Sequence, residues 1–357
     1  MNTNNYKREL FKHSPILIWG SGSAGKEILD FIRSERKESK VYFIDSNPDF
    51  WNKTRYGCYV IPPKDLLRFI DNNPNAKILI GSKANTQIKA ELDKIGIESS
   101  RIDINALGII RNFFVNNASE IIAQNKEIIN QVYNLLADDK SKMIYKRIIQ
   151  YRCTGDLSLL ENLAEKEENQ YFEPEFKRPH FHESYVDCGG YVGDTLSAFL
   201  NYTDNQYDAY YIFEPDEDSY HKMIEFVNRL ESHNITAFMK GCWNVETKLR
   251  FNSSGTWSSH IDNNGKCEIE TVMLDHVLSD KEITFIKMDI EGAEKEALQG
   301  CANLIRKNHP MLAISIYHKI QDLFLIPLYI WNLSHDYSLY IRVYSERSDT
   351  EIICYAL

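Results

Sequence analysis

The fold of the C-terminal half is decided by the stretch YVDCGGYVGDT at residues 185–195, which ends a predicted β-strand and opens a helix. Gly189 and Gly190 let the backbone turn sharply and approach a ligand, and Gly193 lets the next helix pack closely on the sheet. Ligands of open α/β sheets bind at the carboxyl ends of the strands. We therefore expect a cofactor at this turn, with Asp187 holding a polar, cationic part of it.

A second acidic turn, FEPD at residues 213–216, follows one strand–helix–strand unit later. Its Glu214 lies 27 residues after Asp187, where a nucleotide-binding unit places the acid that accepts hydrogen bonds from ribose hydroxyls. Either motif alone could be a set of turn glycines or a solvated carboxylate without a ligand. The two motifs together, in this order and at this spacing, predict a cofactor site. The predicted cofactor-binding residues are Asp187, Gly189, Gly190, Gly193, Thr195, Glu214, Asp216 and Trp243, the last expected to flank an adenine.

The remainder of this half alternates predicted strands with helices, which is typical of a parallel sheet with crossover helices. Two closing strands have no helix between them and should form an antiparallel hairpin. The predicted strands are Tyr185–Cys188, Ala209–Phe213, Ala237–Gly241, Thr247–Phe251, Thr271–Val277, Thr284–Met288, Leu312–Tyr317, Leu339–Tyr344 and Ile352–Ala356.

Residues from about 170 to 357 resemble the FkbM family of methyltransferases. The resemblance is carried by DCGGYVGDT (187–195), FEPD (213–216), GCWN (241–244), FIKMDIEGAEKEALQG (285–300) and the closing LYIRVYS and CYAL. It implies S-adenosylmethionine as cofactor and methyl transfer to a hydroxyl oxygen, commonly of a sugar. Gly190 departs from the alanine that is more frequent in the family, a change that we expect to be sterically tolerated.

A hydroxyl acceptor must lose its proton, either to a general base or through a metal that lowers its pKa. Asp289, in the DIEG segment, and His318 each end a predicted strand, and both are candidate catalytic residues. His318 could instead be a structural histidine. Glu294 and Glu296 are interpreted as acidic charges at the start of the next helix. A divalent metal at the site is left open. Tyr171 and Phe172 are candidates for covering the site. Ser258 and Ser259 are candidates for contacting the cofactor or the acceptor.

The N-terminal half contains a second glycine-rich turn, WGSGSAG at residues 19–25, between a predicted strand and a helix. Asp45 follows Gly25 by 20 residues and ends the second strand, where a ribose-binding acid belongs. This region resembles small Rossmann-like domains that precede sugar-modifying enzymes. Gly20, Gly22, Gly25 and Asp45 form a predicted site for a nucleotide or nucleotide-sugar. The alternative is a site that has lost its ligand and serves folding, dimerisation or substrate presentation.

The composition argues against several classes of partner. A formal charge of -10 without a dense basic cluster argues against nucleic acid. Seven scattered cysteines and a polar N-terminus without a secretory signal are typical of a reducing, cytoplasmic setting. An uninterrupted apolar run of about 18 residues, as a membrane span needs, is missing from the sequence.

A length of 357 residues favours two domains over one. We predict an α/β protein with two Rossmann-like domains: residues 1–110, a helical connector at 111–175, and a methyltransferase domain at 176–357 whose sheet ends in an antiparallel hairpin. The predicted activity is O-methylation of a small-molecule or glycan hydroxyl, on a surface polysaccharide, a glycan or a nucleotide-sugar precursor. The alternatives are an NAD(P)-dependent oxidoreductase or epimerase that uses the N-terminal turn, and a non-catalytic scaffold. A homo-oligomer is left open.

Overall fold

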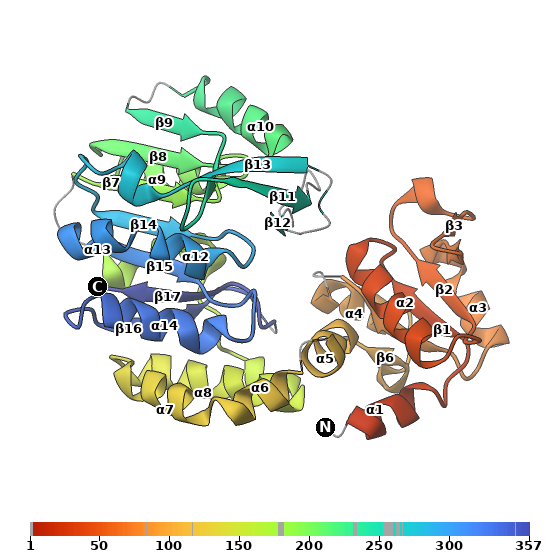
Figure 1. Ribbon diagram of the computed structural model, residues 1–357. Helices are drawn as coiled ribbons and strands as arrows, with labels where there is room; N and C mark the ends of the chain where they lie inside the picture. Colours follow the sequence, from red (N-terminus) through yellow and green to blue (C-terminus); the bar gives the residue numbers. More distant parts are fainter. Residues whose placement is uncertain are drawn as a thin grey trace. The chain divides into compact units, whose positions relative to one another are not determined.

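The computed structural model describes residues 3–82, 85–115, 117–177, 182–230, 234–252, 260–261, 265, 267–346 and 348–357. Two compact units make up the chain: the N-terminal unit, Met1–Glu120 with Gln150–Leu157, and the C-terminal unit, Ile121–Ile149 with Ser158–Leu357 (Figure 1). Residues of the predicted connector are found in both units, and the domain boundaries given above stay a prediction.

The N-terminal unit is built on a six-stranded sheet of order β3-β4-β2-β1-β5-β6. All neighbouring strands are parallel except β3, which is antiparallel to β4. The strands are β1 (Ile16–Trp19), β2 (Val41–Ile44), β3 (Thr54–Arg55), β4 (Cys58–Ile61), β5 (Lys77–Ile80) and β6 (Ile102–Asp103). The helices are α1 (Thr3–Leu10), α2 (Ser23–Glu35), α3 (Leu66–Asn72), α4 (Asn85–Lys94) and α5 (Ala106–Ile109).

Both faces of this sheet are apolar, as covered parallel strands require. Along β1, Ile16 and Ile18 point into one buried cluster, and Leu17 and Trp19 point into another. Strand order reverses between β1 and β5. Strands β2, β3 and β4 lie on one side of β1, and the later strands β5 and β6 lie on the other side. The glycine-rich turn after β1 therefore lies at the reversal point, where α/β sheets bind ligands.

The C-terminal unit has a seven-stranded sheet of order β16-β17-β15-β14-β7-β8-β9. Five neighbouring strands, from β15 to β9, pair in parallel, and β17 runs antiparallel to both β15 and β16, which confirms the predicted closing hairpin. The strand order reverses between β7 and β14. The strands are β7 (Ser184–Cys188), β8 (Ala209–Phe213), β9 (Ile235–Phe238), β14 (Phe285–Met288), β15 (Met311–Ser315), β16 (Leu339–Val343) and β17 (Ile352–Ala356).

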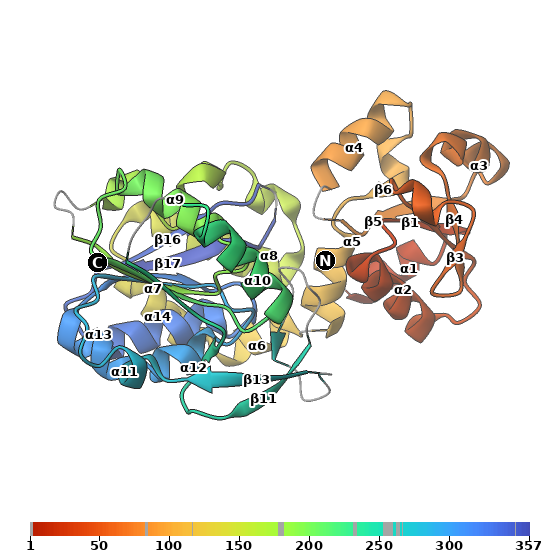
Figure 2. The same ribbon diagram turned by 90° about the horizontal axis from the view of Figure 1, so that it is seen from above.

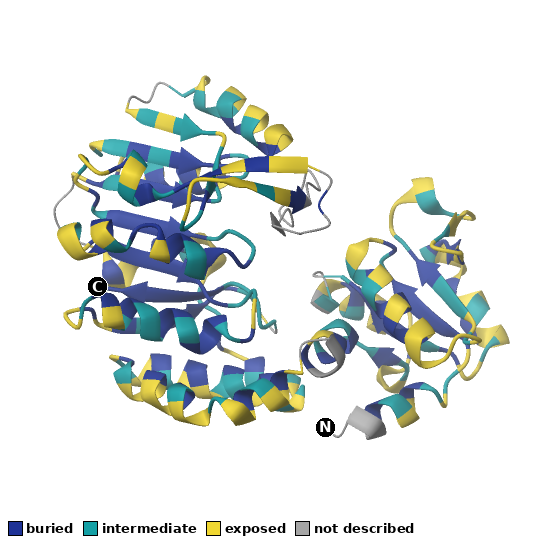
Figure 3. Ribbon diagram, in the orientation of Figure 1, coloured by how far each residue is buried: buried dark blue, intermediate teal, exposed yellow. Residues whose placement is uncertain are grey.

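Helices cover both faces of this sheet (Figure 2). An aromatic cluster fills one face, where Phe199 of α9 and Met223 of α10 pack on strand residues such as Tyr185 and Tyr210. Strands β14, β15 and β17 are buried at every residue (Figure 3). The helices are α6 (Ala118–Gln124), α7 (Lys126–Leu135), α8 (Asp139–Thr154), α9 (Asp194–Tyr202), α10 (Glu217–Val227), α11 (Leu274–Val277), α12 (Glu294–Gln299), α13 (Ala302–Asn308) and α14 (Asp322–Leu333).

Two predicted strands were wrong in part. The predicted strand Ala237–Gly241 is broken, because β9 ends at Phe238 and the chain moves to a second sheet of order β10-β13-β11-β12. The predicted strand Thr271–Val277 ends at Val272, and its last residues form α11. The second sheet contains β10 (Gly241–Cys242), β11 (Lys248–Asn252), β12 (His260–Ile261) and β13 (Cys267–Val272).

Among the residues that the structure describes, none of the helices is both long enough and apolar enough to cross a membrane.

Candidate functional site

The turn after β7 lies against the turn after β14, at the point where the strand order reverses. Gly189 has a φ of 89°, in the left-handed region that favours glycine. A Cβ atom on Gly189 would lie 2.0 Å from the carbonyl oxygen of Asp289. The two strand ends therefore meet backbone to backbone, and a side chain at residue 189 would push them apart.

Gly190 faces the interior of the sheet and not an open space. A Cβ atom there would lie 2.3 Å from Cγ1 of Ile212 and 3.1 Å from the sulfur of Met223. Ile212 thus occupies the volume of the methyl group that alanine would carry at residue 190. Gly193 is the N-cap of α9, and Thr195 is buried in the first turn of that helix.

Asp187 is fully buried, and protein groups already bind both of its carboxylate oxygens. Tyr210 Oη donates to Oδ2 at 2.6 Å, and Lys287 Nζ donates to Oδ1 at 2.9 Å. Lys287 also donates to the carbonyl oxygen of Gly189 at 2.7 Å. Burial alone would lower the pKa of Lys287, but the charge of Asp187 raises it above its ordinary value. Asp187 therefore fixes the turn through a charged lysine, and its direct contact with a cofactor stays a prediction.

Glu214 follows β8 beside the same turn. Its Oε2 accepts a hydrogen bond from the backbone N–H of Tyr191 at 2.9 Å, and its Oε1 accepts one from Asp216 at 2.8 Å. Burial raises the pKa of Glu214 to about 7. A carboxylate offers about four lone-pair sites, so two acceptor positions remain for a ligand. Asp216 caps α10 by accepting from the backbone N–H of Ser219 at 3.0 Å.

Trp243 directly follows β10 and is partly buried. Its backbone N–H donates to Val272 at 2.9 Å, and its carbonyl oxygen would lie 2.0 Å from a Cβ atom on Gly300. These contacts fix the backbone of Trp243, while adenine contact by its ring stays a prediction. Ser258 and Ser259 lie outside the described residues.

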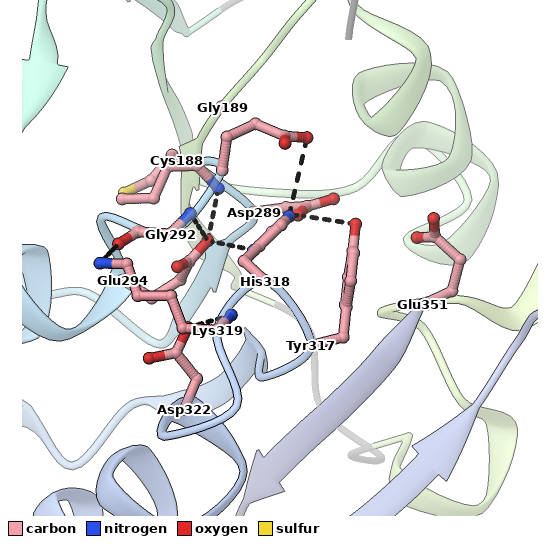
Figure 4. Close-up of polar contacts among 12 residues, drawn as sticks. Cys188, Gly189, Asp289, Gly292, Glu294, Tyr317, His318, Lys319, Asp322 and Glu351 are labelled. Carbon is pink, nitrogen blue, oxygen red and sulfur yellow. Dashed lines mark hydrogen bonds and ion pairs between the residues drawn. The ribbon is translucent and has the colours of Figure 1, made fainter. Parts of the chain in front are cut away.

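Asp289 directly follows β14, beside Tyr317 and His318 (Figure 4). Its side chain is 21% exposed. Tyr171 donates a hydrogen bond from Oη to Asp289 Oδ2 at 2.7 Å, and Tyr317 donates one to Oδ1 at 3.4 Å. Burial would raise the pKa of Asp289, but the positive charges of His318 and Lys287 hold it below its ordinary value. The carboxylate is therefore ionised near neutral pH.

His318 lies beside Asp289, with 3.4 Å between Nε2 and Oδ1, so the two predicted catalytic residues are brought together. Its ring is only 8% exposed and also faces Glu294, at 3.0 Å between Nδ1 and Oε1, and Glu291, at 3.6 Å between Nε2 and Oε1. Burial would lower the pKa of His318, but the carboxylates of Glu294 and Glu291 raise it well above its ordinary value.

Three residues at this site were not predicted in the roles that the structure gives them. The role of Lys287 was missed because the residue lies within the predicted apolar strand FIKM. A lysine in such a strand requires a buried partner, which was the available signal. Glu294 was interpreted as a helix-start charge, and it does accept from the backbone N–H of Ile290 at 2.8 Å, but it also contacts His318. Tyr171 was expected only to close the site, whereas its hydroxyl binds Asp289. Phe172 packs in the aromatic core.

The four predicted N-terminal site residues gather at the turn between β1 and α2. Gly20 directly follows β1, and Gly25 packs against the carbonyl oxygen of Gly20. Gly22 is the N-cap of α2, with open space where a Cβ atom would lie. Asp45 Oδ2 accepts hydrogen bonds from the backbone N–H and the hydroxyl of Ser21, at 2.8 and 2.5 Å. The acid is thus held at the turn by its own neighbours.

Comparisons with known proteins agree with the C-terminal geometry. Residues 187–338 match the family model described as the methyltransferase FkbM domain. The crystal structure of methyltransferase FkbM from Methylobacillus flagellatus KT covers 100% of this chain and 94% of its own, with a TM-score of 0.75 and 20% identity. The chain therefore has the fold of that protein. No curated protein matches the chain.

Two further solved structures are less similar. An rRNA methylase from Streptococcus thermophilus covers 49% of this chain and 85% of its own, with a TM-score of 0.34 and 14% identity. UDP-D-quinovosamine 4-dehydrogenase from Vibrio fischeri covers 24% of this chain and 75% of its own, with a TM-score of 0.22 and 26% identity. Scores this low carry no argument about the present chain.

Proposed function

We propose, from the methyltransferase FkbM domain at residues 187–338, that this chain transfers a methyl group from S-adenosylmethionine to a hydroxyl oxygen. The cofactor supplies a methyl group activated on a sulfonium. The single observation that carries the proposal is the hydrogen bond from the glycine-rich turn to the Glu214 carboxylate. This turn follows β7, where the strand order of the sheet reverses. That crevice is where α/β sheets bind nucleotide-like ligands.

The residues present fit the cofactor. Glu214 is fixed by two backbone N–H groups and keeps two acceptor positions, as many as the two hydroxyls of a ribose need. Lys287 and Asp187 hold the turn rigid, so that little conformational entropy is lost on binding. In this proposal Glu214 binds the ribose, and the backbone after Gly189 lies along the methionine part.

Asp289 is the better placed of the two candidate bases. Its carboxylate is 21% exposed, whereas the ring of His318 is 8% exposed and surrounded by carboxylates. Tyr171 and Tyr317 hold the Asp289 carboxylate in place by donating to its two oxygens, one each. Asp289 would accept the hydroxyl proton while the acceptor oxygen bonds to the methyl carbon and the methyl–sulfur bond breaks. General-base catalysis of this kind contributes about 10²–10⁴-fold.

The acceptor that we propose is a sugar hydroxyl of a glycan or of a nucleotide-sugar precursor, a class that rests on the family resemblance. A second binding function is supported by the N-terminal turn, where Gly20, Gly22, Gly25 and Asp45 lie together at a strand-order reversal. A nucleotide or nucleotide-sugar bound there would fit the same substrate class. An oxidoreductase or epimerase that uses NAD(P) is the competing proposal for that unit.

Calorimetric titration with S-adenosylhomocysteine tests the cofactor site, with NAD⁺ and UDP-sugars titrated in parallel. Hydrogen bonds to a charged acceptor are each worth about 1.5–3 kcal/mol, so Glu214→Ala should weaken binding about 10- to 100-fold. Glu225→Ala is the matched control, because that carboxylate is 71% exposed on α10 and should leave the affinity unchanged. Binding of NAD⁺ without binding of S-adenosylhomocysteine would overturn the proposal and favour the oxidoreductase.

A further inference from the structure

An excess of carboxylates surrounds one histidine beside the proposed methyl-transfer site. Asp289, Glu291 and Glu294 all lie within 3.6 Å of the nitrogens of His318. Concentrated negative charge in a poorly hydrated site is stabilised by a cation.

Several polar atoms of this cluster lack hydrogen bonds, although they are buried. Within the described part of the chain, neither ring nitrogen of His318 has a hydrogen-bond partner of acceptable geometry, and Glu294 Oε2 has none. Glu294 is 0% exposed, so that water does not compensate this oxygen. An unsatisfied buried polar atom costs about 1–3 kcal/mol, and more where the group is charged. Metal binding through one ring nitrogen of His318 would release a proton from the ring, because an imidazole that ligates a metal is neutral.

The spacing of these atoms fits a single metal ion. Asp289, Glu294 and His318 each offer one ligand atom, and the three atoms lie within 4.8 Å of one another. Two ligands on opposite sides of one cation are about 4.2 Å apart when each bond is about 2.1 Å long. Side-chain movements of less than about 1 Å would therefore close the set around an ion.

We propose that Asp289, Glu294 and His318 bind a divalent first-row metal ion. One imidazole and two carboxylates form a mixed nitrogen and oxygen set that suits Mn²⁺ or Fe²⁺ better than the all-oxygen set that Mg²⁺ and Ca²⁺ prefer. Glu294 is positioned for this role by the backbone N–H of Ile290, which binds its Oε1 and leaves Oε2 available.

The use of the metal rests on the proposed function. An ion ligated by Asp289 would lie at the carboxyl end of β14, next to the turn proposed to hold the cofactor. There it would bind the acceptor hydroxyl and lower the pKa of that hydroxyl, so that less of the proton transfer depends on Asp289. Metal binding itself does not depend on this role and can be measured without any substrate.

The test uses the full chain, stripped of metal by a chelator and dialysed. Titration with MnCl₂ should show one tight site by calorimetry, and the electron paramagnetic resonance signal of free Mn²⁺ should fall by one equivalent. His318→Gln and Glu294→Gln should each weaken Mn²⁺ binding at least 10-fold. His276→Gln is the matched control, because that histidine faces Glu246 at 3.1 Å on the surface and should leave binding unchanged.

Folding and cofactor binding are measured on the same samples, by circular dichroism and by titration with S-adenosylhomocysteine. The absence of a Mn²⁺ site in the parent protein, or equal affinity in folded His318→Gln, would overturn the metal proposal. A parent protein that binds Mn²⁺ but not S-adenosylhomocysteine would instead count against the proposed function alone. If Glu294→Gln does not fold, His318→Gln still decides the question, because the side chain of His318 is 8% exposed and that of Glu294 is 0% exposed.

Discussion

Glu214 illustrates how one buried carboxylate couples cofactor binding to stability. It is 7% exposed, and burial raises its pKa from 4.5 to about 7. Between these two pH values the unfolded chain has lost the proton that the folded chain still holds. The free energy of unfolding should therefore fall as pH rises through this window. The total decrease is up to about 3 kcal/mol, because each unit of pKa difference corresponds to about 1.36 kcal/mol. A ligand that donates hydrogen bonds to the ionised form would recover part of this cost.

The prediction at this scale is that Glu214→Gln removes that pH dependence. Urea unfolding of the parent and the variant, measured between pH 5 and pH 8, should show the variant gaining stability relative to the parent as pH rises. The pH range is set by the pKa of about 7 for this group. Parallel pH profiles for the two proteins would mean that Glu214 is ionised throughout the range.

At the scale of elements, β16 is an edge strand that the chain covers with its own helical segment. Leu136, directly after α7, forms a bridge to Leu339, and Ser141 Oγ accepts from the backbone N–H of Ile341 at 2.9 Å. Arg342, 0% exposed, pairs with Asp138 and with Glu175, each at 2.7 Å. Covering an edge in this way prevents pairing with strands of other molecules.

Arg342→Met should therefore destabilise the C-terminal unit by about 2 kcal/mol, because the buried Ser141 hydroxyl and the buried carbonyl oxygen of Ile341 lose the charged donor that binds both. The measurement is the unfolding transition that S-adenosylhomocysteine shifts. Arg229→Met serves as the control, since its pair with Glu225 is 76% and 71% exposed and should contribute less than about 0.5 kcal/mol. Equal effects of the two substitutions would show that the Arg342 network adds no more than a surface pair.

Sequence patterns predicted the elements whose signals are local. The strand before Asp187, the turn at Gly189 and Gly193, and the closing hairpin all follow from short-range periodicity and turn chemistry. The strand predicted at Thr271–Val277 was wrong beyond Val272 because a distant contact overrides it. Asp275 accepts backbone hydrogen bonds from Asn303 and Leu304, which holds residues 274–277 as a helix at the start of α13.

The interior of the candidate site was less predictable for the same reason. Lys287 and Asp187 are 100 residues apart in sequence, and Tyr171 and Asp289 are 118 apart, yet each pair is joined by a hydrogen bond. Spacing along the chain carries no signal for such pairs. The strand ends were predictable because a parallel sheet brings them to one edge, but the side chains that bind them come from elsewhere in the fold.

For the whole molecule, the division into units predicts which fragments will fold. The C-terminal unit includes Ile121–Ile149, whose Ile144, Tyr145 and Ile148 are each 1% exposed. A fragment of residues 121–357 should bind S-adenosylhomocysteine and unfold cooperatively, whereas residues 158–357 should be less stable by several kcal/mol or aggregate, since burying each such side chain contributes about 1.5–3 kcal/mol. Equal melting temperatures for the two fragments would show that the segment is dispensable.

The early segment Ile121–Ile149 belongs to a unit whose last strands are made much later, and this affects folding during synthesis. The segment 121–149 leaves the ribosome long before β16, the strand that it covers, since residue 343 comes 194 residues after residue 149. At about 5–20 residues per second, synthesis leaves that segment without its partner for about 10–40 s. During this interval α7 and α8 expose apolar side chains to the cell, so the nascent chain is a natural client for chaperones that bind hydrophobic helices until the last strands of the sheet arrive.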